Sequence, residues 1–134
     1  MGDSSNPESI LSAKIPLNIL IAEDDDINQM MIRGAFAKLG YAPDMVANGR
    51  AAVEKVGEAQ YDMVFMDLYM PEMDGWEAVA AIRAAGHEMP IVAMTAEVDE
   101  EKLAKCKAIG MVDAIQKPIT MASITEAIEN YGKA

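Results

Sequence analysis

Five polar side chains stand at the ends of short apolar runs in this sequence. Glu23 and Asp24 follow the run LNILIA, and Asp67 ends the run YDMVFMD. Thr95 and Lys117 stand at the ends of two later runs. Carboxylates held together without basic partners bind hard cations, and Mg²⁺ needs only a few of them besides water and a phosphate oxygen. Lysine and threonine side chains suit phosphate oxygens, so the set predicts a Mg²⁺-dependent site for phosphoryl chemistry.

Asp67 is the candidate phosphoacceptor among these residues. The sequence has no Walker motif and no GxGxxG loop to cradle a nucleotide, so we expect the phosphoryl group to come from another molecule. A carboxylate can itself attack phosphorus and form an aspartyl phosphate, and Asp67 stands alone between apolar neighbours. A calcium-binding EF-hand loop starting at Asp24 is excluded, because Gln29 replaces its glycine and Ala35 its closing glutamate.

Alternating strand and helix patterns must bring these residues together. The strand patterns cover 17–22, 42–47, 61–67, 89–95 and 112–116, and the helical patterns that follow them cover 26–39, 48–58, 75–85, 97–109 and 120–131. Short strands joined by helical crossovers form a doubly wound parallel sheet with helices on both faces. Ligands bind such sheets outside the carboxyl ends of the strands. We therefore predict an α/β fold with a five-stranded parallel sheet, five helices and one functional edge.

Polar residues ahead of the helical patterns predict where three of the helices begin, and Asn48 is the expected N-cap of the second. Asp26, with Gln29 three residues later, and Asp74, with Glu77, have the spacing of capping boxes. Thr95 also fits the N-cap position of the fourth helix, which is the structural alternative to a role in phosphate binding.

Length and composition predict one soluble domain. The 134 residues suffice for a single core of ordinary size. Residues 1–16 are polar and turn-rich, which predicts a flexible tail or linker ahead of a domain over residues 17–131. The net charge of -11 argues against direct contact with nucleic acid. No apolar run reaches the length of a membrane span and no signal peptide is visible, so we expect a cytoplasmic protein without membrane insertion.

Four short segments match the pattern of a known family in order and spacing. They are the acidic pair at 23–24, MDLYMPEMDG at 66–75, MTA at 94–96 and KP at 117–118. With them the sequence resembles the receiver domains of two-component response regulators over residues 17–131. It resembles in particular the receivers that belong to, or serve, hybrid sensor histidine kinases. The resemblance implies a flavodoxin-like sheet with strand order 2-1-3-4-5.

The same resemblance implies a role for each site residue. It makes Asp67 the phosphoacceptor, Thr95 the switch hydroxyl and Lys117 the phosphate-binding lysine, with a cis peptide bond before Pro118. The Mg²⁺ ligands that it implies are Glu23, Asp24, Asp67 and the backbone carbonyl of Tyr69.

The resemblance also implies a function in a phosphorelay. Asp67 would take a phosphoryl group from a phosphohistidine on a sensor histidine kinase or a histidine phosphotransfer protein. The chain would then switch a protein-interaction surface or pass the group to a phosphotransfer histidine. It would catalyse only its own phosphorylation and dephosphorylation, so we do not expect an enzyme with a separate substrate. A monomer or a weak dimer is expected.

Two other functions compete with this one. A phosphorylation-independent interaction module of the same fold has no need of Asp67, Thr95 and Lys117, and their presence argues against it. An aspartyl-phosphate hydrolase of the haloacid dehalogenase type needs a second acid two residues after its nucleophile, where this sequence has Tyr69.

Two positions depart from the family's pattern. Glu23 stands where Asp is commoner, which lengthens one arm of the site without removing its charge. Ala114 stands three residues before Lys117, where the family often has an aromatic residue that rotates on activation. Because alanine has no ring to rotate, we expect activation to move the backbone over residues 95–110 instead.

Overall fold

Unbroken apolar runs form the middle of a parallel sheet. A computed structural model describes residues 10–132 of the chain. Its strands are β1 (Ile19–Ala22), β2 (Asp44–Val46), β3 (Met63–Asp67), β4 (Ile91–Thr95) and β5 (Asp113–Gln116), in the order β2-β1-β3-β4-β5. Every residue of β1, β3 and β4 is buried, as strands covered on both faces require. The predicted five-stranded parallel sheet and its strand order are confirmed.

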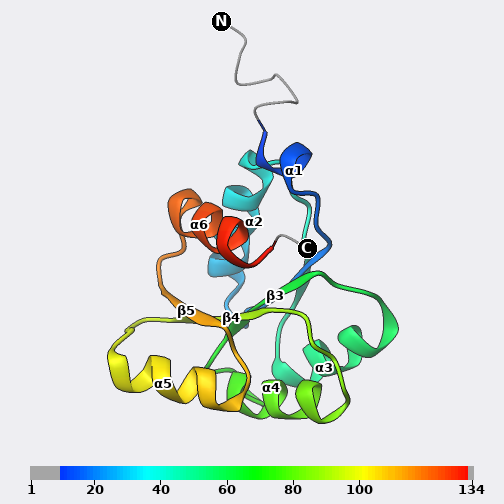
Figure 1. The fold of residues 1–134 in the computed structure, drawn as a ribbon, viewed down its shortest axis with the longest axis vertical. Helices are drawn as coiled ribbons and strands as arrows, with labels where there is room; N and C mark the ends of the chain where they lie inside the picture. The colour runs from blue at the N-terminus through cyan, green and yellow to red at the C-terminus, as the bar shows by residue number, and fades with distance from the viewer. Residues whose placement is uncertain (1–9, 133–134) are drawn as a thin grey trace, which may run out of the picture.

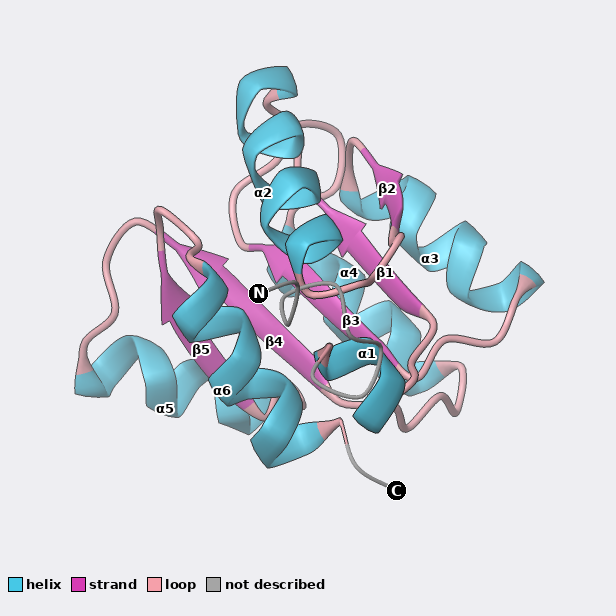
Figure 2. Cartoon of the chain, turned by 90° about the horizontal axis from the view of Figure 1, so that it is seen from above, coloured by secondary structure: helices cyan, strands magenta, loops and turns pink. Residues whose placement is uncertain are grey.

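Helices cover both faces of this sheet (Figure 1). One layer contains α2 (Asp26–Lys38) and α6 (Met121–Tyr131), and the other contains α3 (Gly49–Glu58), α4 (Gly75–Ala84) and α5 (Glu100–Ile109). Figure 2 shows α2 and α6 lying across the near face of the sheet. Alternate residues of each strand serve the two layers: Met63 and Phe65 of β3 belong to the core under α2 and α6, whereas Val64 and Met66 belong to the core under α3 to α5. No helix within residues 10–132 is both long and apolar enough to cross a bilayer.

A sixth helix, α1 (Leu11–Lys14), precedes the sheet and corrects part of the predicted tail. Residues 1–9 of that tail lie outside the described residues. The following segment is packed: the Ser12 amide donates a 3.0 Å hydrogen bond to the Leu39 carbonyl, and the Tyr41 hydroxyl donates to the Ile15 carbonyl. Leu11 and Ile15 also pack against the core under α2 and α6. The polar composition of the stretch as a whole concealed these apolar anchors.

The observed helix starts confirm the caps predicted at Asn48 and Asp74 and correct the one predicted at Asp26. Asp74 caps α4 and forms the predicted capping box with Glu77. At α2 the cap is Asp25 rather than Asp26, because Asp25 has the extended backbone and accepts a 2.8 Å hydrogen bond from the Asn28 amide. α5 is capped by Asp99. Thr95 therefore does not cap this helix, and its hydroxyl is available for other contacts.

Gly75 brings the start of α4 against the end of β3. Its amide donates a 2.9 Å hydrogen bond to the Leu68 carbonyl. A Cβ atom at this position would lie 2.2 Å from the Asp67 carbonyl oxygen, which is backbone and cannot turn aside. The close approach thus fixes the loop that follows Asp67.

We predict that Gly75→Ala lowers the free energy of unfolding by about 1–3 kcal/mol, the usual cost of overpacking. Gly34→Ala is the matched control, since Gly34 is an exposed glycine inside α2 with nothing within 4 Å of an added Cβ. That control should gain about 0.5–1 kcal/mol, because alanine loses less backbone entropy on folding. Urea unfolding of both variants measures these changes. Equal changes in the free energy of unfolding would contradict the close approach at Gly75.

Candidate functional site

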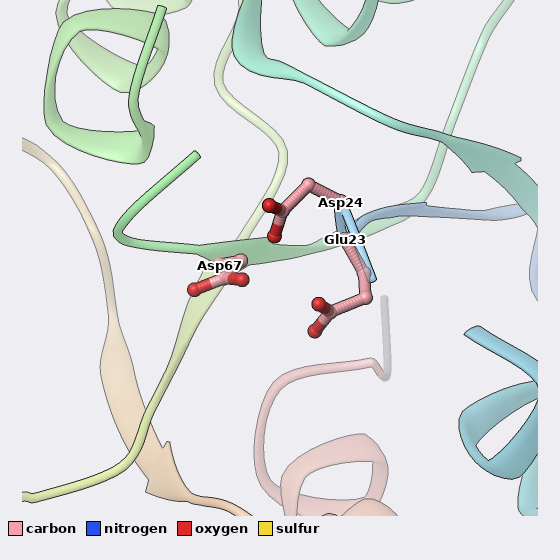
Figure 3. Close-up of side chains that lie close together, drawn as sticks. All are labelled: Glu23, Asp24 and Asp67. Atoms are coloured by element: carbon pink, nitrogen blue, oxygen red, sulfur yellow. The ribbon is translucent and has the colours of Figure 1, made fainter. Parts of the chain in front are cut away.

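Three carboxylates meet at the carboxyl ends of β1 and β3. Ala22 of β1 is level with Met66 of β3, so the residues that follow leave the sheet side by side. Glu23, Asp24 and Asp67 each offer one oxygen, and these oxygens lie within 4.8 Å of one another (Figure 3). Across residues 10–132 this is the one group of three or more His, Cys, Asp or Glu side chains with metal-binding spacing.

Lys117 reaches the same point from the end of β5. Its Nζ lies 2.7 Å from Glu23 Oε1 and 3.0 Å from Asp67 Oδ2. The Lys117 amide also donates a 2.7 Å hydrogen bond to the Thr95 carbonyl. The peptide bond between Lys117 and Pro118 is cis, as predicted. The ammonium therefore bridges the carboxylates of two different strands.

Most of the site is shielded from water. Glu23 is 0% exposed, Asp67 5% and Thr95 2%, whereas Asp24 is exposed. Each buried carboxylate accepts a hydrogen bond from the backbone amide two residues later: Asp25 N donates to Glu23 Oε2 over 3.1 Å, and Tyr69 N donates to Asp67 Oδ1 over 3.2 Å. The turns after β1 and β3 thus hold the two carboxylates in the same way.

Burial and neighbouring charges perturb both ionisable partners. Burial raises the pKa of the Asp67 carboxyl, Lys117 opposes this by its hydrogen bond and charge, and the Glu23 charge adds to the rise. For Lys117, burial lowers the pKa, but the two carboxylates outweigh burial and the net shift is upward. One ammonium is therefore shared by two carboxylates, and its single positive charge does not balance their negative charge.

The site fits a divalent cation. Glu23 Oε1 is buried and lies 2.7 Å from the Lys117 ammonium, which Asp67 shares at 3.0 Å. Three carboxylates face only one ammonium, and carboxylate oxygens are the ligands that Mg²⁺ takes. The predicted Mg²⁺ ligands Glu23, Asp24 and Asp67 are thus brought together, whereas the part of the Tyr69 carbonyl stays a prediction.

Lys102 is a further residue of the site that sequence reasoning missed. Its Nζ lies 3.4 Å from Thr95 Oγ1 and 5.5 Å from the centroid of the Tyr69 ring. Lys102 belongs to no sequence motif and stands seven residues after Thr95 on a different element. The signal that could have found it is the start of α5 at Glu100, which sets Lys102 in the first turn beside the end of β4.

Comparison with known proteins identifies the family. The sequence model of a family described as the response regulator receiver domain matches residues 19–129. This chain belongs to that family. Among its relatives, hybrid signal transduction histidine kinase L of Dictyostelium discoideum is 34% identical over 129 residues, which cover 90% of this chain and 8% of that protein. Probable histidine kinase 1 of Oryza sativa subsp. indica is 31% identical over 84% of this chain and 15% of its own length.

Solved receiver structures share the fold. The receiver domain of sensor histidine kinase PA1611 from Pseudomonas aeruginosa PAO1, solved with a magnesium ion coordinated in its active site cleft, has a TM-score of 0.78 and 33% identity, covering 86% of this chain and 96% of that one. The receiver domain of Ssk1 from Saccharomyces cerevisiae, crystallised with the histidine phosphotransfer protein Ypd1, has a TM-score of 0.81 and 28% identity over 87% and 88% of the two chains.

We predict that Asp67→Asn stabilises the metal-free receiver domain at neutral pH. Because the pKa of Asp67 is raised on folding, its protonation favours the folded state, and that contribution is lost as the pH rises through the folded-state pKa. Asparagine stays neutral, so its advantage over the wild type should be largest at pH 7 and should vanish below about pH 3, where the carboxyl is protonated in both states. Unfolding of both proteins in EDTA across this range tests the prediction, and a pH-independent difference would contradict it.

Proposed function

We propose that this receiver domain accepts a phosphoryl group on Asp67 from a phosphohistidine donor in a Mg²⁺-dependent reaction. The observation that carries the proposal is the position of the Asp67 carboxylate: it is nearly buried, lies 3.0 Å from the Lys117 ammonium, and stands next to the carboxylates of Glu23 and Asp24. A phosphorylation-independent interaction module would gain nothing from burying this charge.

The proposed reaction is an in-line transfer between two proteins. A carboxylate oxygen of Asp67 attacks the phosphorus, the bond from phosphorus to the imidazole nitrogen of the donor breaks, and the electron pair of that bond leaves with the nitrogen. Lys117 supplies positive charge next to the phosphoryl oxygens, and the Thr95 hydroxyl donates a hydrogen bond to one of them. The low access to water around Asp67 strengthens these interactions.

Mg²⁺ would be held by Glu23, Asp24, Asp67 and the Tyr69 carbonyl. When bound, it neutralises charge on the phosphoryl oxygens. The magnesium ion in the PA1611 receiver supports this assignment, since that chain is 33% identical to this one. One Glu23 oxygen accepts from the Asp25 amide and the other lies 2.7 Å from the Lys117 ammonium, so Glu23 would face the ion with both of its oxygens already oriented.

An exposed apolar face on α2 offers a surface for the donor. Ile27, Met30 and Met31 are 66%, 71% and 56% exposed, and their spacing sets them on one side of the helix. Met31 also lines a small hollow with Lys117, Pro118 and other residues, so this face borders the site. The Ypd1–Ssk1 complex supports a histidine phosphotransfer protein as the partner, and the related histidine kinases support a kinase. We place this exchange in the cytoplasm.

Phosphorylation of Asp67 tests the proposal directly. Incubation of the wild type with phosphoramidate and Mg²⁺ should add the mass of one phosphoryl group, because this small donor needs no docking surface. Asp67→Asn and wild type in EDTA should show no such addition on the same time scale. An intact-mass spectrum decides the result, and a phosphorylated product from Asp67→Asn would reject the assignment.

Docking on α2 is tested by comparing two donors. We expect Met30→Glu to lower the rate of transfer from a phosphorylated histidine phosphotransfer protein about tenfold, the effect of losing roughly 1.4 kcal/mol of binding, because it puts a charge in the apolar face. Its rate with phosphoramidate should not change. Ala80→Glu is the control, since it adds the same charge on an exposed part of α4 in the other layer. Equal losses in Met30→Glu with both donors would contradict docking at this face.

A further inference from the structure

The Thr95 hydroxyl is buried and depends on a lysine from α5. Thr95 is 2% exposed and ends β4, whose Met94 is level with Asp67 on the neighbouring strand. Within the described residues its hydroxyl has one hydrogen-bond partner, the ammonium of Lys102, at 3.4 Å. We propose that Lys102 is a positioning residue that turns the Thr95 hydroxyl proton toward the phosphoryl site, a role that rests on the function proposed above.

The argument begins with the proton on the hydroxyl. A lysine ammonium has three donors and no acceptor, so the Thr95 oxygen must accept in this contact. The hydroxyl proton then cannot point at Lys102 and is turned away from α5. Asp67 ends β3 on the neighbouring strand, level with the residue before Thr95, so the phosphoryl site borders this hydroxyl. A phosphoryl oxygen on Asp67 would therefore meet a donor that is already oriented.

The same contact also strengthens the hydroxyl as a donor. A hydroxyl that accepts from a cation is polarised, and hydrogen bonds in series reinforce one another where water is excluded. Thr95 and Asp67 are both nearly inaccessible to water, so the gain is little screened. The series would run from the Lys102 ammonium through the Thr95 hydroxyl to the phosphoryl oxygen.

Lys102 is itself held in place rather than free in solvent. Its backbone amide donates a 2.7 Å hydrogen bond to Asp99, the N-cap of α5, and its ammonium lies over the Tyr69 ring. A hollow of about 140 Å³ beside it is lined by Tyr69, Trp76, Asp99, Glu101, Lys102 and Lys105. An ammonium over an aromatic face is stabilised by the ring's electrons. The loop after Asp67 and the start of α5 thus hold the cation against Thr95.

Lys105 provides a matched control within the same hollow. It stands one turn further along α5, borders the same Tyr69 and Trp76 side chains, and is exposed. Among the described contacts it has no hydrogen bond with Thr95. Replacing either lysine removes one positive charge near the site. A difference between the two variants therefore measures the contact with the Thr95 hydroxyl, and not the loss of positive charge alone.

The first measurement is the rate of Asp67 phosphorylation by phosphoramidate in Mg²⁺. We expect Lys102→Met to slow it about tenfold, as the loss of one oriented charge-assisted contact would, and Lys102→Arg to recover most of the rate. Lys105→Met should match the wild type. In a Thr95→Val background, Lys102→Met should have no further effect. An equal slowing with threonine or valine at position 95 overturns the proposal, because the lysine would then act without the hydroxyl.

The second measurement does not depend on phosphorylation. In the unmodified protein, the Thr95 methyl and amide signals in NMR spectra should shift in Lys102→Met and stay in place in Lys105→Met. Unchanged Thr95 signals in Lys102→Met would overturn the contact. A wild type that never gains the phosphoryl mass would instead reject the proposed function, so the two failures are told apart.

Discussion

Two buried carboxylates that share one ammonium are the constraint on which the rest of this receiver domain depends. Taking charged groups out of water costs several kcal/mol for each group unless they are paired and hydrogen-bonded. Glu23 and Asp67 meet that cost with Lys117 and with the backbone amides of the turns that follow their strands. The compensation is incomplete, since one ammonium faces three carboxylates once Asp24 is counted. That deficit makes the edge a receptor for added positive charge.

Strand order decides which side chain can reach and pair with the two buried carboxylates. Parallel strands lie about 4.8 Å apart, so β5 is about 10 Å from β3 and further still from β1. A long, flexible side chain is needed to cross β4 and reach both carboxylates, and Lys117 at the end of β5 has that reach. The side chain it passes must be short, as Thr95 is at the end of β4. The residues that β4 and β5 pair further inside the sheet are small too, since Ala93 pairs with Ala114.

The sequence was sufficient for the sheet and for most of the site, for two physical reasons. Strands buried on both faces leave unbroken apolar runs, and the carboxyl ends of parallel strands share one edge, so Asp67, Thr95 and Lys117 could be placed without coordinates. The burial of Glu23 could not be predicted, because a run of four acids suggests solvation. Only its first member turns inward; the following three are exposed.

Contacts between elements were beyond sequence reasoning for a related reason. Asp25 and Asp26 are chemically alike, and the backbone after β1 alone decides that Asp25 caps α2. The contact between Lys102 and Thr95 depends on where α5 starts and how it lies on the sheet, and no local pattern encodes that packing.

The docking of α1 bears on where this domain begins as a physical unit. Similarity to the family starts at residue 19, yet the packed structure starts by residue 10. An added Cβ on Gly40 would lie 2.0 Å from Ser12 Oγ, so the turn after α2 is shaped around the earlier segment. A fragment cut at the similarity boundary would expose the Tyr41 hydroxyl and the apolar surface beneath Leu11. The match to the family therefore starts later than the packed structure of this chain, which already includes α1.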